Sequence, residues 1–293
     1  MKIKLNPRLA VVLSMGIFGT LGPFVRNIPV SSGELALYRA VLAALMIGGF
    51  LLVTGQRIPF KRIGWGIPLL LLSGAAMGFN WILLFEAYRY TTVSTATLCY
   101  YFAPVLVTIA SPILFREKLG AKGILCFAMS TLGIVLITGV GSLGGGKAFL
   151  GILFALGAAV LYASVVLMNK FIKSVDGIHR TFLQFLAAIA VLTPYVLLNG
   201  GVTLGSMDGV GWSCLLTVGL VHTGVAYCLY FTSLKDLSGQ QAAILSYVDP
   251  LVAVLVSVAV LGESMGPWQI VGGILILGFT LYNEISPKKE KQI

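Results

Sequence analysis

The chain has 293 residues, of which 58% are hydrophobic and only 10% are charged. A soluble domain carries roughly 25% charged residues, so this composition excludes a water-exposed surface over most of the chain. The net charge is +10, but the basic residues stand in short segments between apolar runs. That distribution is typical of a membrane protein and argues against a nucleic-acid groove.

Ten apolar runs of about 20 residues follow one another, and a run of that length crosses a bilayer as a helix. The runs do not alternate between polar and apolar residues, which excludes the strands of a membrane barrel. We therefore predict an all-α integral membrane protein. The predicted helices cover residues 9–27, 33–53, 66–88, 92–114, 121–140, 149–169, 179–198, 210–233, 239–260 and 267–284.

Lysine and arginine gather in alternate loops. One side of the predicted membrane keeps only Arg26, Arg39, Arg89 and Lys147, and the remaining basic residues fall on the other side, with both chain ends. By the positive-inside rule, both termini are expected in the cytoplasm and the protein in a plasma (inner) membrane. No small-residue cleavage site follows the first apolar run, so we expect an uncleaved first helix.

The second half of the chain repeats the first at an offset of 146 residues. The matched pairs include Tyr101 with Tyr247, Pro104 with Pro250, Ser111 with Ser257 and Glu117 with Glu263. Each unit holds five predicted helices, so the second unit enters the membrane from the opposite side. We predict two inverted repeats, residues 1–141 and 149–293, joined by a Gly-rich linker at 142–148. Inverted repeats are the architecture of many alternating-access transporters.

Several segments carry a family resemblance. They are Tyr38-Arg39-Ala40, the run Ala-Tyr-Arg-Tyr-Thr-Thr at 87–92, the run Tyr-Phe-Ala-Pro-Val at 101–105, Arg-Glu-Lys-Leu at 116–119, and less typical counterparts at 237–242, 247–252 and 261–263. With them the chain resembles the drug/metabolite transporter superfamily, EamA type, over nearly its whole length. The resemblance implies a ten-helix secondary carrier that exports amino acids or other small metabolites. We expect no cofactor.

Ionisable groups at membrane depth are costly and need a reason. Asp249 lies near the centre of the ninth predicted helix, directly before Pro250, and His222 lies near the centre of the eighth. The proline is expected to kink its helix toward a cavity. We interpret Asp249 and His222 as a site for proton coupling or for a substrate amine. The alternative is a buried pair that only holds two helices together.

Arg39 and Glu86 are expected at similar depth, near the outer side of the second and third helices. One interpretation is that Arg39 binds a substrate carboxylate through its planar guanidinium. Another is that Arg39 and Glu86 form an ion pair, either as an outer gate or as a static salt bridge.

Further polar and aromatic side chains are expected at central depth, where each hydroxyl needs a partner. We predict that they line a substrate cavity, with helix packing as the alternative. These residues are Asn80, Trp81, Tyr100, Tyr101, Tyr162, Tyr227 and Tyr247. As counterparts in the two halves, Tyr101 and Tyr247 should face each other. Glu117 and Glu263 stand at helix ends, where a structural role is expected.

Other functions have less support. No metal-ligand spacing is present, and neither a protease nucleophile elbow nor a second membrane aspartate accompanies Asp249. We therefore expect no enzyme activity, with an intramembrane enzyme as a distant alternative. The expected partners are a small-molecule substrate, the lipid bilayer and protons, but no nucleic acid, with the protein a monomer or homodimer. An uncoupled facilitator, a channel, or an exporter of another metabolite or a cationic drug stays open.

Overall fold

The computed structural model describes residues 6–58, 66–115, 120–138, 146–172, 175, 177–234, 236–237 and 239–285. Within these ranges ten helical spans are long and apolar enough to cross a membrane. Their ends differ from the predicted ends by at most two residues, with the ninth span counted from the start of α13. The prediction of an all-α, ten-span membrane protein is therefore confirmed.

Several spans consist of more than one helix. The helices are α1 (Pro7–Gly19), α2 (Leu21–Arg26), α3 (Ser32–Val53), α5 (Ile67–Tyr90), α6 (Val93–Tyr100), α7 (Ala103–Phe115), α8 (Ala121–Thr138), α9 (Lys147–Phe171), α10 (Gly177–Leu198), α11 (Gly209–Leu216), the π-helix η4 (Thr217–Val225), α12 (Ala226–Leu234), α13 (Gly239–Ser246), α14 (Val248–Leu261) and α15 (Pro267–Ile285). Thus α1 with α2, α6 with α7, α11 with η4 and α12, and α13 with α14 each form one span.

Local sequence explains where helices begin and end. Ser31 and Glu34 form a capping box at the start of α3, because each side chain binds the backbone N–H of the other residue. The side chain of Thr92 caps α6. Gly262 ends α14 with φ at 64°, a left-handed conformation that glycine adopts without strain. Pro267 then starts α15, where its missing N–H costs nothing.

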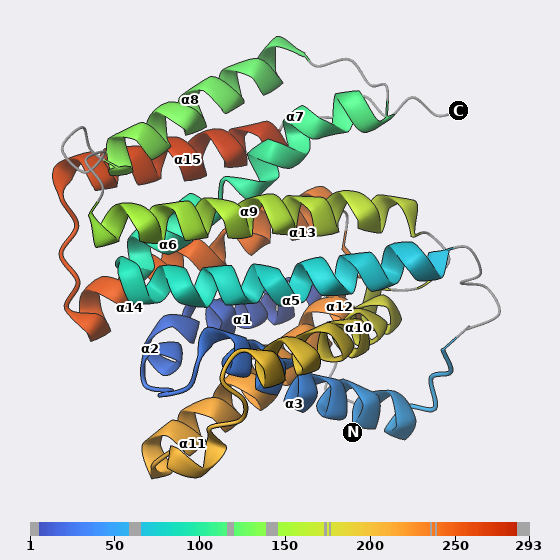
Figure 1. Cartoon of the computed structure of the whole chain (residues 1–293). Helices are drawn as coiled ribbons and strands as arrows, with labels where there is room; N and C mark the ends of the chain where they lie inside the picture. Colours follow the sequence, from blue (N-terminus) through green and yellow to red (C-terminus); the bar gives the residue numbers. More distant parts are fainter. Residues whose placement is uncertain are drawn as a thin grey trace, which may run out of the picture.

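The long helices run side by side, and segments far apart in sequence become neighbours (Figure 1). Helix α5 packs along both α9 and α10, while α8 packs along α15. Small residues allow the closest approaches: a Cβ placed on Gly133 would come within 2.6 Å of the Gly272 carbonyl oxygen. Close packing of this kind stabilises helix pairs in lipid, where apolar surface alone gives no preference for a neighbouring helix.

Three of the spans are interrupted in the middle. Thr20 separates α1 from α2, Tyr101 and Phe102 separate α6 from α7, and Tyr247 separates α13 from α14. Pro104 and Pro250 each follow a break by a few residues and cannot donate a helical hydrogen bond. The break before Pro250 agrees with the distortion that the sequence predicted there.

Two predicted features fall partly or wholly outside the described residues. Of the expected linker at 142–148, residues 142–145 are outside the described part, and α9 already begins at Lys147. Glu117 is also outside it. The division into repeats at 1–141 and 149–293 stays a prediction.

Candidate functional site

A cavity of about 280 Å³ lies where the three interrupted spans meet. This volume is close to the lower end of the range for small-molecule sites. Residues at each break line it: Gly19 beside the first, Tyr101 in the second and Tyr247 in the third. Interrupted membrane helices that meet at a cavity are a recurrent feature of transporter binding sites.

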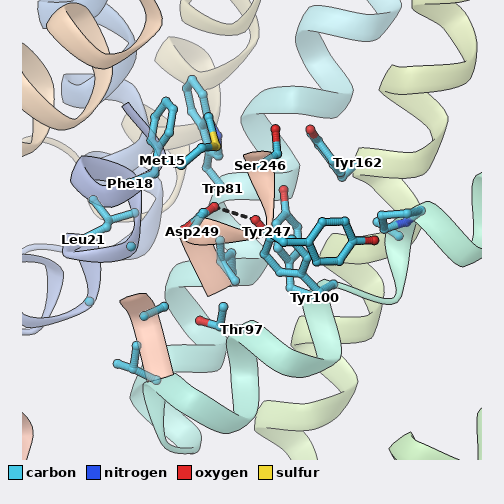
Figure 2. A pocket seen from close by; sticks show the side chains of 18 of the residues that line it. Met15, Phe18, Leu21, Trp81, Thr97, Tyr100, Tyr162, Ser246, Tyr247 and Asp249 are labelled. Carbon is cyan, nitrogen blue, oxygen red and sulfur yellow. Dashed lines mark hydrogen bonds between the residues drawn. The ribbon is translucent and has the colours of Figure 1, made fainter. Parts of the chain in front are cut away.

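Different helices form the opposite walls of this cavity. Met15, Phe18 and Leu21 lie on one side, Tyr100 and Tyr162 lie on the other, and Asp249 lies between them (Figure 2). The full set of lining residues is Met15, Phe18, Gly19, Leu21, Gly22, Arg39, Trp81, Leu84, Tyr88, Val93, Thr97, Tyr100, Tyr101, Ala103, Pro104, Tyr162, Tyr227, Tyr230, Ser246, Tyr247, Asp249, Ala253 and Glu284. The wall is thus rich in tyrosine and contains two acidic groups and one basic group.

Asp249 occupies the first turn of α14, immediately after the break at Tyr247. Its Oδ2 accepts a hydrogen bond of 2.7 Å from the Tyr101 hydroxyl, drawn as the dashed line in Figure 2. An ionised carboxylate accepts about four hydrogen bonds, and this is the one that the described residues supply. Asp249 therefore has accepting capacity that is open to a ligand in the cavity.

Arg39 lies on α3, buried, with 4% of its surface exposed. Its guanidinium carbon lies 4.6 Å from the centre of the Trp81 ring and 5.7 Å from that of Phe85. Its Nε donates a hydrogen bond of 2.7 Å to Thr223 Oγ1. No residue in the described ranges accepts a hydrogen bond from its terminal Nη atoms. Stacking on aromatic rings thus replaces part of the lost hydration, while the donors at the end of the side chain stay available.

Two opposite charges therefore line one cavity without pairing. Among the described residues the ion pairs are Arg26 with Glu263 and Arg89 with Glu86, and neither includes Arg39 or Asp249. A buried charge normally pairs with a partner in the protein. Arg39 and Asp249 are thus two buried charged side chains on one cavity that form no ion pair with a described residue.

The predicted ion pair between Arg39 and Glu86 does not form. Glu86 instead pairs with Arg89, one turn further along the same helix, with 3.7 Å between Glu86 Oε1 and Arg89 Nη1. Arg39 donates its Nε hydrogen bond to the Thr223 hydroxyl. The expectation was wrong because sequence position gives the depth of a residue in the membrane but not the side of the helix on which it lies.

His222 does not line the cavity and does not touch Asp249. Its Nε2 is hydrogen-bonded to Thr20 Oγ1 at 2.9 Å, and its Nδ1 lies 3.2 Å from the Thr217 carbonyl oxygen. The ring also contacts Phe24, with the ring centres 4.8 Å apart. His222 therefore joins the π-helix to the break between α1 and α2.

Asn80 also lies away from the cavity wall. Its Nδ2 donates a hydrogen bond of 2.6 Å to the Ala158 carbonyl oxygen, and its Oδ1 accepts one of 3.4 Å from the Tyr100 hydroxyl. Asn80 thus links α5 to α9 and orients a cavity tyrosine. It acts on the cavity through Tyr100 rather than by direct contact.

All the other predicted site residues do line the cavity: Arg39, Trp81, Tyr100, Tyr101, Tyr162, Tyr227, Tyr247 and Asp249. The rings of Tyr101 and Tyr247 lie with centres 6.3 Å apart, so these two tyrosines are neighbours, as expected. Tyr100 contacts Tyr162 at 5.5 Å, and Tyr227 packs against Phe18 at 5.1 Å. The aromatic rings on the cavity thus form two contacting groups, one of Tyr247, Tyr101, Tyr100 and Tyr162 and one of Phe18 and Tyr227.

Several residues at or behind the cavity were not predicted. Tyr88, Thr97, Tyr230, Ser246 and Glu284 line it, and Thr223 holds Arg39 from behind. Glu284 carried a signal that could have been used, since it is an acidic residue at the end of an otherwise apolar span. Thr223 carried none, because a threonine in an apolar helix is common.

Glu263 forms a second charged cluster beside the cavity, at the end of the bundle where α14 turns into α15 (left in Figure 1), and of its partners Val93 also lines the cavity. Its carboxylate pairs with Arg26 at 2.6 Å and accepts the Val93 backbone N–H at 2.9 and 3.2 Å. It also accepts the Ser257 hydroxyl. We call Glu263, Arg26, Val93 and Ser257 the Glu263 cluster. It joins α2, α6 and α14, in agreement with the structural role expected for Glu263.

The chain matches the model of the EamA-like transporter family twice, over residues 7–139 and 149–283. Together these matches cover most of the chain. The chain belongs to this family.

Relatives of similar length agree. The uncharacterized transporter YxxF of Bacillus subtilis is 30% identical over 280 residues, which cover 94% of this chain and 88% of that protein. An uncharacterized transporter of Archaeoglobus fulgidus is 31% identical, with 93% and 94% of the two chains covered. A crystal structure at 16% identity superposes with a TM-score of 0.65 over 94% of this chain and 96% of the other, which supports the fold.

This EamA-like protein is therefore a multi-pass membrane transporter of small molecules and not an enzyme. Within the described residues no three His, Cys, Asp or Glu side chains gather as a metal site would require. The tyrosine-lined cavity is accordingly the candidate substrate site.

Proposed function

We propose that this EamA-like transporter is a secondary carrier that exports amino acids by alternating access. The observation that carries the proposal is the pair of unpaired opposite charges, Arg39 and Asp249, on one small cavity. A zwitterion would present its carboxylate to the guanidinium and its ammonium group to the carboxylate. Each charge would then gain a partner only when substrate is bound.

The rest of the wall suits the rest of an amino acid. Trp81, Tyr100 and Tyr227 give apolar surface for a side chain, and their rings keep water away from the charged contacts. Arg39 and Asp249 form no ion pair with a described residue, so a zwitterion bound between them would add a contact to each charge.

Proton coupling is part of the proposal. From the described residues Asp249 accepts one hydrogen bond, that of Tyr101, and a carboxylate at this position can exchange a proton when no substrate is bound. His222 would serve the movement between states rather than carry the proton to Asp249, since it bridges η4 and the α1–α2 break.

The proposed topology follows the basic residues and the internal repeat. Both termini would lie in the cytoplasm of a cell whose plasma (inner) membrane holds the protein, and residues 1–141 and 149–293 would form inverted units. Cysteine substitutions at exposed loop positions, labelled from either side of the membrane, test this orientation. Labelling of both chain ends from the outside would contradict it.

The test of function is counterflow in proteoliposomes loaded with single amino acids, with empty liposomes as the control. Saturable exchange of one group of amino acids, together with net uptake of the same amino acids that a pH gradient drives into liposomes without internal substrate, is the expected result. Exchange without net uptake driven by a pH gradient would identify an uncoupled facilitator. Folded protein that exchanges no amino acid would remove the amino-acid substrate.

An organic cation is the second candidate substrate. Its support is the combination of Asp249 with a tyrosine wall, which suits a cation through charge and ring contacts. Arg39 on the same cavity opposes it by like-charge repulsion. Uptake of tetraphenylphosphonium into the same liposomes distinguishes this candidate from the first.

A further inference from the structure

We propose that Thr223 is a positioning residue, which holds the Arg39 guanidinium so that its two terminal nitrogens bind a planar carboxylate of the substrate. The proposal rests on the proposed function only in assuming that the substrate carries such an anionic group. Its own basis is the hydrogen-bond geometry behind the cavity wall.

The Thr223 hydroxyl has a fixed direction. It donates its proton to the Val218 carbonyl oxygen at 2.8 Å, which leaves its lone pairs for the Arg39 Nε at 2.7 Å. Thr223 is fully buried, so no water competes for either bond. A hydroxyl has one proton and two acceptor positions, and this arrangement makes Thr223 an acceptor toward Arg39.

The π-helix creates this arrangement. Val218 stands five residues before Thr223, and Thr217 stands five residues before His222, whose ring it also contacts through its carbonyl oxygen. In an α-helix a threonine hydroxyl reaches the carbonyl three or four residues earlier. The wider turn of η4 instead lets two successive buried polar side chains, His222 and Thr223, each reach the backbone carbonyl oxygen five residues earlier. Short π-helical segments are frequent at functional sites.

Close packing brings η4 onto the helix that carries Arg39. A Cβ on Gly219 would come within 2.4 Å of Leu42 Cδ1, and one on Gly224 would come within 2.8 Å of Met46 Cγ. Leu42 and Met46 lie one and two turns after Arg39 on α3. The two glycines therefore permit the approach that sets the short bond between Thr223 and Arg39.

A second contact also fixes the Arg39 guanidinium. Trp81 stacks on its guanidinium at 4.6 Å, so the group is held in one plane by a ring and in one direction by Thr223. With Nε occupied, the two Nη groups form the fork that matches the two oxygens of a carboxylate. A lysine in place of Arg39 would offer a point charge without this direction.

The experiment measures ligand binding by the change in Trp81 fluorescence emission. The background protein carries Trp65→Phe, Trp212→Phe and Trp268→Phe, so that Trp81 is the one tryptophan that remains of four. Three probes separate the two charges: L-leucine, 4-methylpentanoate, which has the carboxylate but no ammonium group, and L-leucinamide, which has the ammonium group but no carboxylate. Each is titrated against the background protein and against Thr223→Val, Thr223→Ser and Arg39→Lys.

We expect saturable changes in Trp81 emission with L-leucine and 4-methylpentanoate. In Thr223→Val the dissociation constant of both should rise by about 10-fold, the effect of one charged hydrogen bond, while Thr223→Ser stays within about 2-fold. Arg39→Lys should raise the dissociation constants of both L-leucine and 4-methylpentanoate. The control is Thr193→Val, whose exposed hydroxyl binds only the Ile189 carbonyl of its own helix; it should bind like the parent protein.

Unchanged affinity for both acids in Thr223→Val would overturn the proposal, as would equal losses in Thr223→Val and Thr223→Ser. Failure of folded parent protein to bind either acid would overturn it too. Binding of 4-methylpentanoate without amino-acid counterflow would leave the positioning role standing and refute the proposed function. Amino-acid counterflow with the same KM in Thr223→Val as in the parent protein would refute the positioning role and leave the proposed function standing.

Discussion

The cavity and the Glu263 cluster both hold charged residues among membrane helices, but they use them differently. In the Glu263 cluster both charged groups have several partners: Glu263 accepts hydrogen bonds from Arg26, Val93 and Ser257, and Arg26 also donates to the Tyr88 and Thr91 carbonyl oxygens at 3.3 and 3.0 Å. In the cavity, Asp249 and Arg39 each have one hydrogen bond from the described residues.

The difference teaches how to separate a structural charge from a functional one. Buried polar groups are nearly always satisfied, so a charge with spare hydrogen-bonding capacity beside a cavity is a candidate for ligand binding. A charge whose capacity is filled by backbone and side chains indicates a tie between helices. Removal of the first should affect transport, and removal of the second should affect stability.

The largest expected effect on transport is that of Asp249→Asn. The amide keeps the shape and can still accept the Tyr101 hydroxyl, but it cannot pair with an ammonium group or exchange a proton. We expect exchange to fall by roughly 100-fold, the loss of one strong charged contact. The thermal unfolding temperature should stay near that of the parent. Stimulation by a pH gradient that survives in Asp249→Asn would refute proton coupling at this residue.

The next largest effect is that of Glu263→Gln, on stability. The change leaves Arg26, which is partly exposed, without its counter-ion and weakens the bond to Val93, so we expect a loss of about 2 kcal/mol. A lower unfolding temperature in detergent would show it. Glu86→Gln is the matched control, because the more exposed pair of Glu86 and Arg89 should be worth less than about 1 kcal/mol. Equal destabilisation by the two changes would show that the additional partners of Glu263 contribute no more stability than the exposed ion pair of Glu86.

The smallest effect is that of Tyr101→Phe. It removes the hydroxyl that directs Asp249 but keeps the ring beside Tyr247. We expect about a 10-fold higher KM for exchange with a nearly unchanged maximal rate. Tyr195→Phe serves as the control, since its ring packs on Phe79 outside the cavity lining. A maximal rate that collapses while KM stays constant would instead place Tyr101 in the conformational cycle.

The sequence patterns predicted the helices of the fold and part of the candidate site. Helix number and ends follow from apolar length and were predicted to within two residues. The cavity residues Tyr101, Tyr247 and Asp249 were found because polar groups at membrane depth are rare and conspicuous. The prediction of an ion pair between Arg39 and Glu86 was wrong, and the contact of Thr223 with Arg39 was missed. Both contacts depend on how α3 and η4 are rotated toward their neighbours.

The sequence by itself determined that this chain crosses a membrane ten times, since a bilayer of fixed thickness requires about 20 apolar residues per helix. It also determined which residues are too polar to face lipid. The tertiary structure alone decided which of these meet. Lipid is as apolar as the helix surfaces, so the hydrophobic pattern does not show which face turns inward. Glycine contacts, helix breaks and a π-helix decide that, and they placed Arg39 and Asp249 on one cavity.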